Sequence, residues 1–296
     1  MNNFIIETRH LRKLFKGRAA VDALNLSVEA GSIFGFLGRN GAGKTTTVRL
    51  LLGFLKPASG EVRLFGRAIT GPDSGVEARR RIGFVSENKH PYPYMTVNQV
   101  IRFTRPFFPG WRDDLERRYL KMFDLPPDRK VSALSKGMRT GLMLLLAMSH
   151  GAELLILDEP TEGLDPAITE VLLKELVALP ASEGTTIFFS SHQLAEVDQI
   201  ADHIAIIDGG RAVVGGSLDD LKLQYQCIRV VFARQPVAVH WLEGAERVRQ
   251  DGSTVSILVS RNVEAIVDQA RSLPGASVER YPVGLKEIFL ESIGRH

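Results

Sequence analysis

The sequence lacks several features that would point to particular classes of protein. It has one cysteine in 296 residues, Cys227, which excludes an internal disulfide and a cysteine-rich metal site. We interpret this cysteine as a small buried apolar residue. The net charge is only +3, from 37 basic and 34 acidic residues, so the composition does not indicate a nucleic-acid partner.

Long apolar runs are also missing. The longest, Leu142 to Met148, is far shorter than the ~20 residues needed to cross a bilayer. The first residues, Met1 to Glu7, do not combine a basic start with a long apolar stretch, so we expect no secretory signal and a cytoplasmic location. Hydrophobic residues make up 44% of the chain, enough for the core of one large or two modest domains. If the function involves a membrane, we expect another chain to span it.

One stretch fits the phosphate-binding pattern G-x-x-x-x-G-K-[ST] at every fixed position. It consists of Gly38, Arg39, Asn40, Gly41, Ala42, Gly43, Lys44, Thr45 and Thr46. The glycines let successive backbone N–H groups face one anion, and the helix that we expect from Thr45 to Leu52 adds its positive end. Lys44 can reach the outer phosphates and Thr45 a magnesium ion. The buried strand predicted from Ile33 to Leu37 favours a nucleoside-triphosphate site over a glycine-rich turn that binds nothing.

Two adjacent carboxylates follow another apolar stretch. Leu154 to Leu157 predicts a buried strand, and Asp158 and Glu159 come directly after it. Taken alone, such a pair is a solvated strand end. Beside a phosphate loop, Asp158 is a candidate to hold magnesium and Glu159 to orient or deprotonate the attacking water.

Two further sites are predicted from polar residues beside apolar segments. The strand that ends near Phe189 leads to His192, at the sheet edge where parallel strands gather ligands. His192 is either a sensor of the terminal phosphate or an ordinary polar residue with satisfied hydrogen bonds. Ser135 and Gly137 precede a predicted helix, where they form either a second anion site or, for Ser135, a simple helix cap.

The order of predicted elements indicates an α/β fold of the P-loop NTPase kind, with a mixed sheet and a helical insertion. An antiparallel strand pair and two short strands come first, and parallel strands alternate with crossover helices later. The strands are expected at Phe4–Arg12, Ala23–Val28, Glu61–Phe65, Ile82–Val85, Leu154–Leu157, Thr185–Phe189 and His203–Ile207, and the crossover helices at Pro166–Leu179 and Gln193–Ala201. The insertion, about 88–150, has helices that begin near Thr96, near Asp113 and at Ser135.

After about Gln224 the pattern changes. Strands are predicted at Ile228–Phe232 and Thr254–Val259, with Asp251-Gly252 turning between them. Apolar residues then fall on one helical face: Val263, Ile266, Val267 and Ala270. We predict a large domain over 1–224 and a small α+β domain over 225–296.

In the order of its motifs, the chain resembles the ATP-binding subunit of an ABC transporter over roughly its first three quarters. Residues 38–46 match the Walker A motif and residues 154–159 the Walker B motif with its catalytic glutamate. Leu134 to Arg139 resembles the family signature, Gly163-Leu164-Asp165 the D-loop, and His192 the switch histidine. Phe15 falls where an aromatic residue of the family stacks on adenine, although it is also explained as a core or turn residue.

The resemblance implies a mode of action and partners. Such subunits bind ATP and Mg²⁺ and act as head-to-tail dimers, homodimeric or heterodimeric, with two ATP molecules between them. Ser135 and Gly137 would then contact the ATP that Lys44 of a second copy holds, and Asp165 would lie across the interface. The expected partner is an integral-membrane permease, which would place the chain on the inner face of the cell membrane. The helical insertion, with Tyr92, Tyr94 and Met95, is the expected docking surface.

The sequence departs from the family pattern at several positions. Lys136 and Met138 stand where glycine and glutamine are usual in the signature, and Glu162 stands where a small residue is usual. Glu87 replaces a glutamine that senses magnesium, so we count it among the metal ligands. The chain resembles bacterial exporter subunits that are encoded apart from their permease, both in this signature and in the segment Val283–Leu290.

Two alternatives stay open at this stage. The first is a soluble ABC-type ATPase that acts on ribosomes or DNA, although this chain has neither a second ATP-binding half nor a long coiled coil. The second is a regulatory nucleotide-binding module with little turnover, against which Glu159 argues.

Overall fold

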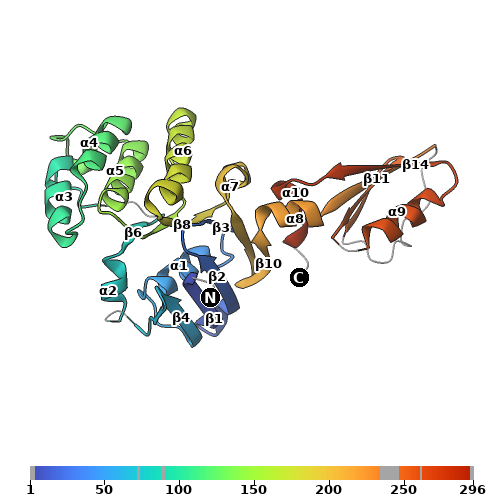
Figure 1. The fold of residues 1–296 in the computed structure, drawn as a ribbon, viewed down its shortest axis with the longest axis horizontal. Helices are drawn as coiled ribbons and strands as arrows, with labels where there is room; N and C mark the ends of the chain where they lie inside the picture. Colours follow the sequence, from blue (N-terminus) through green and yellow to red (C-terminus); the bar gives the residue numbers. More distant parts are fainter. Residues whose placement is uncertain (1–3, 72–73, 88–90, 234–246, 261, 294–296) are drawn as a thin grey trace. The chain divides into compact units, whose positions relative to one another are not determined.

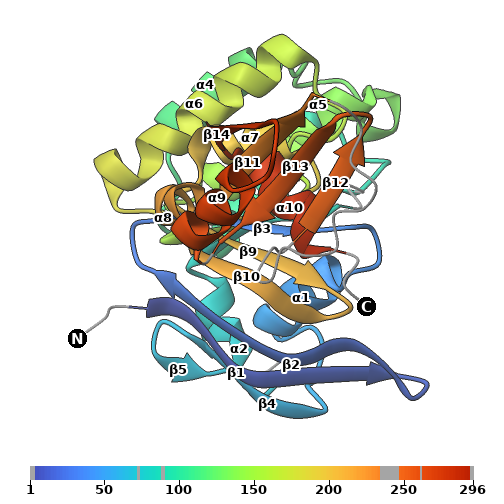
Figure 2. The same cartoon turned by 90° about the vertical axis from the view of Figure 1, so that its right-hand side faces the viewer.

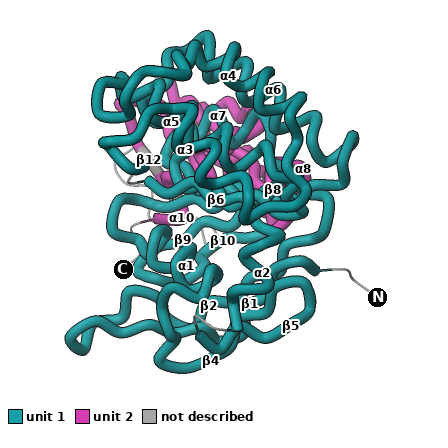
Figure 3. Tube along the Cα trace, turned by 90° about the vertical axis from the view of Figure 1, so that its left-hand side faces the viewer, with its two compact units in different colours: residues 1–215 teal, residues 216–296 magenta. Residues whose placement is uncertain are grey.

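The structure is a computed structural model that describes residues 4–71, 74–87, 91–233, 247–260 and 262–293. It contains two compact units, residues 1–215 and 216–296, shown in two colours in Figure 3. The boundary predicted from the sequence lies further along the chain, between 224 and 225. The predicted start of the helical insertion, at residue 88, lies outside the described residues.

The strands of the first unit form two sheets (Figure 2). An antiparallel sheet has the order β2-β1-β4-β5, and a second sheet has the order β10-β9-β3-β8-β7-β6. The first comprises β1 (Phe4–Phe15), β2 (Arg18–Glu29), β4 (Ser59–Leu64) and β5 (Arg67–Ala68). The second comprises β3 (Ile33–Gly38), β6 (Ile82–Val85), β7 (Leu154–Asp158), β8 (Thr186–Ser191), β9 (His203–Asp208) and β10 (Arg211–Ser217). Four antiparallel strands thus form a sheet of their own. The second sheet is mixed, as predicted, because its strands β6, β7, β8, β3 and β9 are parallel and β10 follows β9 through a two-residue hairpin.

The parallel register of the second sheet places the carboxyl ends of its central strands together. β3 pairs in parallel with β8 and β9, and β7 pairs in parallel with β8 and β6. Gly38, Asp158 and Ser191 therefore end neighbouring strands at one edge. α1 (Lys44–Leu51) follows β3 and lies between the two sheets, where Phe34, Phe36 and Phe188 contribute to a shared core (Figure 2).

The predicted crossover helices and the helices of the insertion are confirmed. The insertion lies between β6 and β7, where its helices group at one end of the unit (Figure 1). These helices are α3 (Val97–Thr104), α4 (Asp113–Met122) and α5 (Lys136–Met148); the crossover helices are α6 (Pro166–Glu183) and α7 (Leu194–Ile200). Thr96 forms a capping box with Gln99, and the Ser135 hydroxyl caps α5, which explains why both starts were predictable. The short α2 (Gly75–Arg79) and the strand β10 were missed.

The second unit is an α+β arrangement with an antiparallel sheet of order β12-β13-β11-β14. Its elements are α8 (Leu218–Gln224), β11 (Gln226–Phe232), β12 (Arg247–Asp251), β13 (Thr254–Val259), α9 (Val263–Arg271), β14 (Ala276–Pro282) and α10 (Leu285–Ser292). Ile228, Val230 and Ile257 are buried against Ile266 and Val267 of α9, so the predicted helical face is confirmed.

Two predictions for this unit were wrong in detail. The turn at Asp251-Gly252 joins β12 to β13, not β11 to β13, because β12 precedes it with a polar sequence that gives little strand signal. Cys227 is half-buried instead of buried, since it alternates with Ile228 and faces away from α9. No helix among the described residues is long and apolar enough to span a membrane.

Candidate nucleotide-binding site

At two positions of the loop between β3 and α1, the backbone has a left-handed conformation that favours glycine. Gly41 and Gly43 have left-handed φ values of 83° and 110°. A Cβ on Gly43 would lie 2.4 Å from the carbonyl oxygen of Ala20, and one on Gly38 would lie 2.7 Å from that of Ile207. Because α1 begins directly at Lys44, the loop directs the first N–H groups of a helix toward its own concave side.

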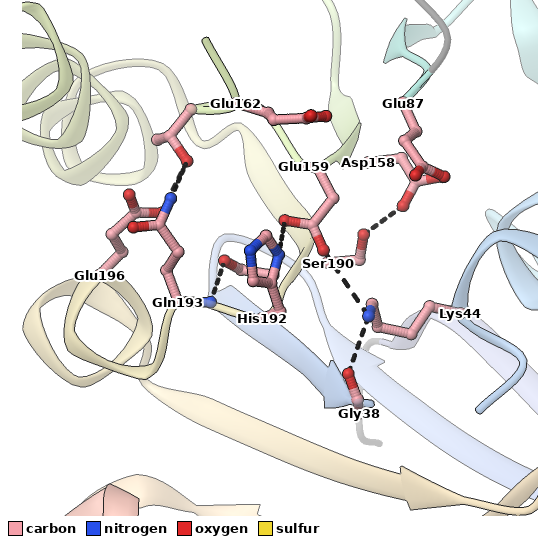
Figure 4. Close-up of polar contacts among 12 residues, drawn as sticks. Gly38, Lys44, Glu87, Asp158, Glu159, Glu162, Ser190, His192, Gln193 and Glu196 are labelled. Carbon is pink, nitrogen blue, oxygen red and sulfur yellow. Dashed lines mark hydrogen bonds and ion pairs between the residues drawn. The ribbon is translucent and has the colours of Figure 1, made fainter. Parts of the chain in front are cut away.

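Lys44 is held inside this loop. Its side chain is buried, and its Nζ donates a hydrogen bond to the carbonyl oxygen of Gly38 at 2.8 Å (Figure 4). The same Nζ lies 3.6 Å from Oε1 of Glu159. The ammonium group is thus positioned between the phosphate loop of β3 and the end of β7.

The two carboxylates after β7 have different environments. Asp158 is 1% exposed and accepts a short hydrogen bond from the hydroxyl of Ser190 on the neighbouring strand. Glu159 has a left-handed φ of 51°, an unusual conformation for a non-glycine residue, and its N–H donates to the carbonyl of Ser190 at 3.1 Å. This local backbone turns the Glu159 side chain toward Lys44 and away from the course of the strand (Figure 4).

His192 follows β8 and meets Glu159 from the other side. Its Nδ1 lies 2.8 Å from Oε2 of Glu159, and its side chain is 53% exposed. Glu159 therefore has one oxygen toward the Lys44 ammonium and the other toward the His192 ring. A carboxylate held at both oxygens has a defined orientation, as a general base requires.

A cavity of about 360 Å³ joins the phosphate loop to these carboxylates. It is lined by Ala20, Arg39, Asn40, Gly41, Gly43, Lys44, Thr45, Thr46, Glu87, Asp158 and Glu159. The Thr45 hydroxyl donates to Oε2 of Glu87 at 3.3 Å, which brings the proposed metal-site residues together. Sequence reasoning missed Ala20 and did not assign a role to Arg39, because neither has a fixed place in the motif.

Six predicted site residues are not among those that line this cavity. Gly38 and Ala42 belong to the phosphate loop itself and His192 contacts Glu159, whereas Phe15, Ser135 and Gly137 lie elsewhere. Phe15 ends β1, is 47% exposed and has the Lys13 ammonium 5.4 Å from its ring centre. Ser135 and Gly137 line a separate cavity of about 550 Å³, together with Gly163 and other residues around the D-loop segment. The Ser135 hydroxyl accepts a hydrogen bond from the N–H of Met138, so the cap expected as an alternative is present.

A buried hydrogen bond beside the site was not predicted. Glu196 on α7 accepts from the hydroxyl of Thr161 at 2.8 Å, and both residues are buried. Burial raises the pKa of the Glu196 carboxyl, while the Thr161 hydrogen bond acts in the opposite direction. Glu196 stands four residues after His192, and a carboxylate between the apolar Ala195 and Val197 of α7 was the signal available in the sequence.

A phosphate loop between a parallel strand and a helix, with paired carboxylates at the end of another parallel strand of the same sheet, defines a P-loop nucleoside triphosphatase. The comparisons with known proteins narrow the class. A family model described as ABC transporter matches residues 21–162. The chain is 36% identical over 260 residues to the bacitracin transport ATP-binding protein of Bacillus licheniformis, covering 84% of this chain and 83% of the relative.

Similarity extends over the whole length in other relatives. A Nod factor export ATP-binding protein of Cupriavidus metallidurans is 33% identical over 303 residues, covering 98% of each chain. A solved dimeric ATP-binding cassette in a post-hydrolysis state, bound to ADP and phosphate, has a TM-score of 0.65 at 22% identity, covering 72% of this chain and 98% of that one, and shows the shared fold. The chain belongs to the ATP-binding proteins of ABC transporters, and it is an ATPase of that family.

Proposed function

We propose that this chain powers a membrane exporter by closing as a dimer on two ATP molecules and hydrolysing them with Glu159. The observation that carries the proposal is the arrangement in which Glu159 lies between Lys44 and His192 at the rim of the phosphate cavity. A base at this place meets the terminal phosphate of a triphosphate seated in the loop, with a water molecule between them.

The side chains divide the chemistry among them. Lys44 and the N–H groups of the loop bind the outer phosphates, which compete with Glu159 for the ammonium group. Once released from Lys44, Glu159 orients the attacking water and accepts its proton. His192, whose Nδ1 lies 2.8 Å from Oε2 of Glu159, keeps this carboxylate oriented toward the attacking water. It would also lie near the terminal phosphate, which leaves on hydrolysis.

The cavity also suits magnesium. Thr45, Asp158 and Glu87 supply the hydroxyl and carboxylate oxygens that this ion prefers, and Thr45 and Glu87 are already in contact. Within the described residues, no group of three or more acidic, histidine or cysteine side chains could hold a metal alone. This agrees with an ion that takes part of its ligands from the protein and the rest from the phosphate oxygens. Magnesium supplies charge neutralisation across the phosphate oxygens.

The separate position of Ser135 and Gly137 supports the dimer. They line a cavity that does not include Lys44, so one chain does not complete a site around one nucleotide. A head-to-tail second copy would bring this cavity to the phosphates held by the first. The structural neighbour that is dimeric and bound to ADP and phosphate is consistent with this mode.

An exposed aromatic row supports docking of a permease on the helical insertion. Tyr94 is 67% exposed, and its ring centre lies 6.1 Å from that of Tyr92. The row continues through Phe103 to Phe107, with ring centres 5.3 and 5.8 Å apart, and both phenylalanines are exposed. Met95, which we also expected here, is partly buried. Contiguous exposed aromatic surface marks an interaction site.

The names of the relatives support export as the direction of transport, and membership of the ABC transporter family supports a place on the cytoplasmic face of the membrane. One is named for bacitracin transport and another for Nod factor export. We extend only the general activity to this chain, not their substrates.

The test is co-expression with the neighbouring genes, purification from membranes and measurement of ATP hydrolysis. We expect a polytopic protein to co-purify and to raise the rate well above that of Glu159→Gln. Hydrolysis that depends on Glu159 but proceeds with no membrane partner would favour the soluble alternative.

A further inference from the structure

Two departures from the family pattern meet in the structure. Nζ of Lys136 lies 2.6 Å from Oε1 of Glu162, although the residues are 26 positions apart in the sequence. Lys136 is the first residue of α5, directly after Ser135, and Glu162 directly precedes the turn of residues 163–165 that leads into α6. The ion pair therefore joins the signature segment to the D-loop segment within one chain.

A buried hydrogen bond lies beneath the ion pair. The Thr140 side chain, one turn further along α5, is 0% exposed. Its hydroxyl lies 2.9 Å from the carbonyl oxygen of Glu162 and 3.2 Å from that of Lys136. Thr140 thus attaches the backbone of Glu162 to the first turn of α5. Lys136 attaches the side chain of Glu162 to the same turn.

Glycine permits the same two segments to approach closely. A Cβ on Gly137 would lie 2.7 Å from the carbonyl oxygen of Gly163, and a Cβ on Gly163 would lie 2.7 Å from Cγ of Lys136. Gly163 also has a left-handed φ of 87°. The aliphatic part of Lys136 thus covers Gly163, and its ammonium group reaches beyond it to Glu162.

The positive charge of Lys136 is stabilised by its ion pair with Glu162. The N-terminal end of a helix carries a partial positive charge, so a lysine at its first position is unfavourable unless an anion is near. Glu162 supplies that anion. Because both side chains are substantially exposed, 62% and 37%, the pair contributes little to folding stability, and its effect is on the relative position of the segments.

The residue that precedes Glu162 is held independently. Thr161 donates to Glu196 of α7 at 2.8 Å, as described above, so residues 159–162 are attached to α7 on one side and to α5 on the other. Glu159 belongs to this same segment. A shift of α5 would therefore act on the backbone three residues after Glu159.

We propose that Lys136 and Glu162 are positioning residues, whose ion pair ties the loop of Ser135 and Gly137 to the turn at 163–165. The two segments then present one rigid surface to the ATP of a second copy. This inference rests on the proposed function, since it assigns the ion pair a role in the dimer.

The first arm of the test uses the full chain without nucleotide, so it does not depend on dimer formation. Hydrogen exchange is measured at residues 136–140 and 161–165 in Lys136→Glu, Glu162→Lys and the variant with both changes. We expect exchange to rise about two- to fivefold in each single variant, the range of an exposed ion pair. Exchange should return close to the wild-type rate in the double variant, in which the pair is restored with its charges reversed.

Control variants separate this effect from general disturbance. Lys174→Glu breaks an exposed ion pair with Glu170 on α6, in which Nζ lies 2.7 Å from Oε1, and should leave both segments unchanged. The neutral changes Lys136→Met and Glu162→Gln remove the attraction without adding repulsion, and they replace any reversed variant that does not fold. Unchanged exchange in all folded variants would overturn the proposal.

The second arm measures ATP-dependent dimerisation by sedimentation in the Glu159→Gln background. Each single variant should weaken the dimer about three- to tenfold, and charge reversal at both positions should recover most of it. If the Lys136→Glu defect persists when Glu162→Lys is added, Lys136 acts on the nucleotide directly and the positioning role is wrong. If the Glu159→Gln parent itself stays monomeric with ATP, the proposed dimer fails, while the exchange arm still decides the ion pair.

Discussion

Lys44 and Glu159 form an ion pair across the rim of the phosphate cavity, with Nζ 3.6 Å from Oε1 and both side chains 8% exposed. Lys44 also donates to the Gly38 carbonyl, so its ammonium group has both a carboxylate and a carbonyl oxygen as partners. In the proposed function, a bound triphosphate would compete with Glu159 for this cation, so release of Glu159 would be coupled to nucleotide binding.

The first prediction concerns Glu159→Gln. Loss of the base should lower the hydrolysis rate by about 10²–10⁴-fold. Loss of the competing charge should leave ATP affinity equal to the wild-type value or tighter, whereas Lys44→Ala should weaken it. Titration with a fluorescent ATP analogue and steady-state hydrolysis measure the two effects. Weaker binding by Glu159→Gln would contradict the competition.

The second prediction concerns His192→Ala. Because His192 contacts Glu159 at 2.8 Å, its loss should misalign the carboxylate and lower kcat on the order of 10- to 100-fold, with little change in KM. His192→Gln, which can still donate a hydrogen bond, should retain more activity. A change in KM alone would show that His192 acts in binding and not on the base.

The third prediction concerns the acidic residue at position 87. Glu87→Gln keeps a partner for the Thr45 hydroxyl but removes a charge from the proposed magnesium site. The Mg²⁺ concentration for half-maximal hydrolysis should rise about three- to tenfold, since carboxylate charge sets the affinity of such sites. Asp158→Asn provides the comparison and should have the larger effect. Unaltered Mg²⁺ dependence would exclude Glu87 from the metal site.

The fourth prediction concerns pH and Glu196. Its folded-state pKa is raised by burial above the ordinary 4.5, so the folded chain holds this proton more tightly than the unfolded chain. Its contribution to stability is therefore lost as the pH rises above 4.5 through the raised folded-state pKa. Glu196→Gln, which can still accept from Thr161, should unfold at a higher temperature than wild type at pH 7.5, and the difference should shrink toward pH 4.5.

A control with the opposite sign is available for this experiment. Ion pairing with Lys174 lowers the pKa of Glu170 on α6, so Glu170→Gln should give no gain in stability at pH 7.5. Thermal unfolding at several pH values measures both variants. A Glu196→Gln variant that is less stable than wild type at pH 7.5 would contradict the prediction.

The fifth prediction concerns the aromatic row. Tyr94→Ala and Phe107→Ala remove exposed rings that do not line the phosphate cavity, so basal hydrolysis should be unchanged. Stimulation of hydrolysis by the permease should fall about tenfold or more, as expected for aromatic anchors of an interface. Val177→Ala on α6, also exposed, is the matched control. Full stimulation in both aromatic variants would place the docking surface elsewhere.

Much of the site could be predicted because its signals are local in the chain. The glycines of the phosphate loop, Lys44 and the helix that begins there act through backbone geometry within a few residues. The same holds for the caps at Thr96 and Ser135, which mark helix starts from side-chain chemistry alone. The apolar strands that lead to Asp158 and His192 likewise indicated one functional edge of the sheet from the sequence alone.

Other features depended on which strands and helices lie side by side. The pairing of β7 with β8 brings the Ser190 hydroxyl to Asp158, and the packing of α7 brings Glu196 to Thr161. The polar β12 and the orientation of Cys227 were misjudged because their environment depends on neighbouring strands, not on their own sequence.

The sequence by itself determined the class of protein, the phosphate loop and the identity of the catalytic candidates, because these follow from short motifs with a fixed backbone. Only the tertiary structure decided that Glu159 joins Lys44 to His192 and that Lys136 pairs with Glu162. Contacts between side chains that are far apart in the sequence depend on strand register and helix packing, and composition and periodicity carry no record of either.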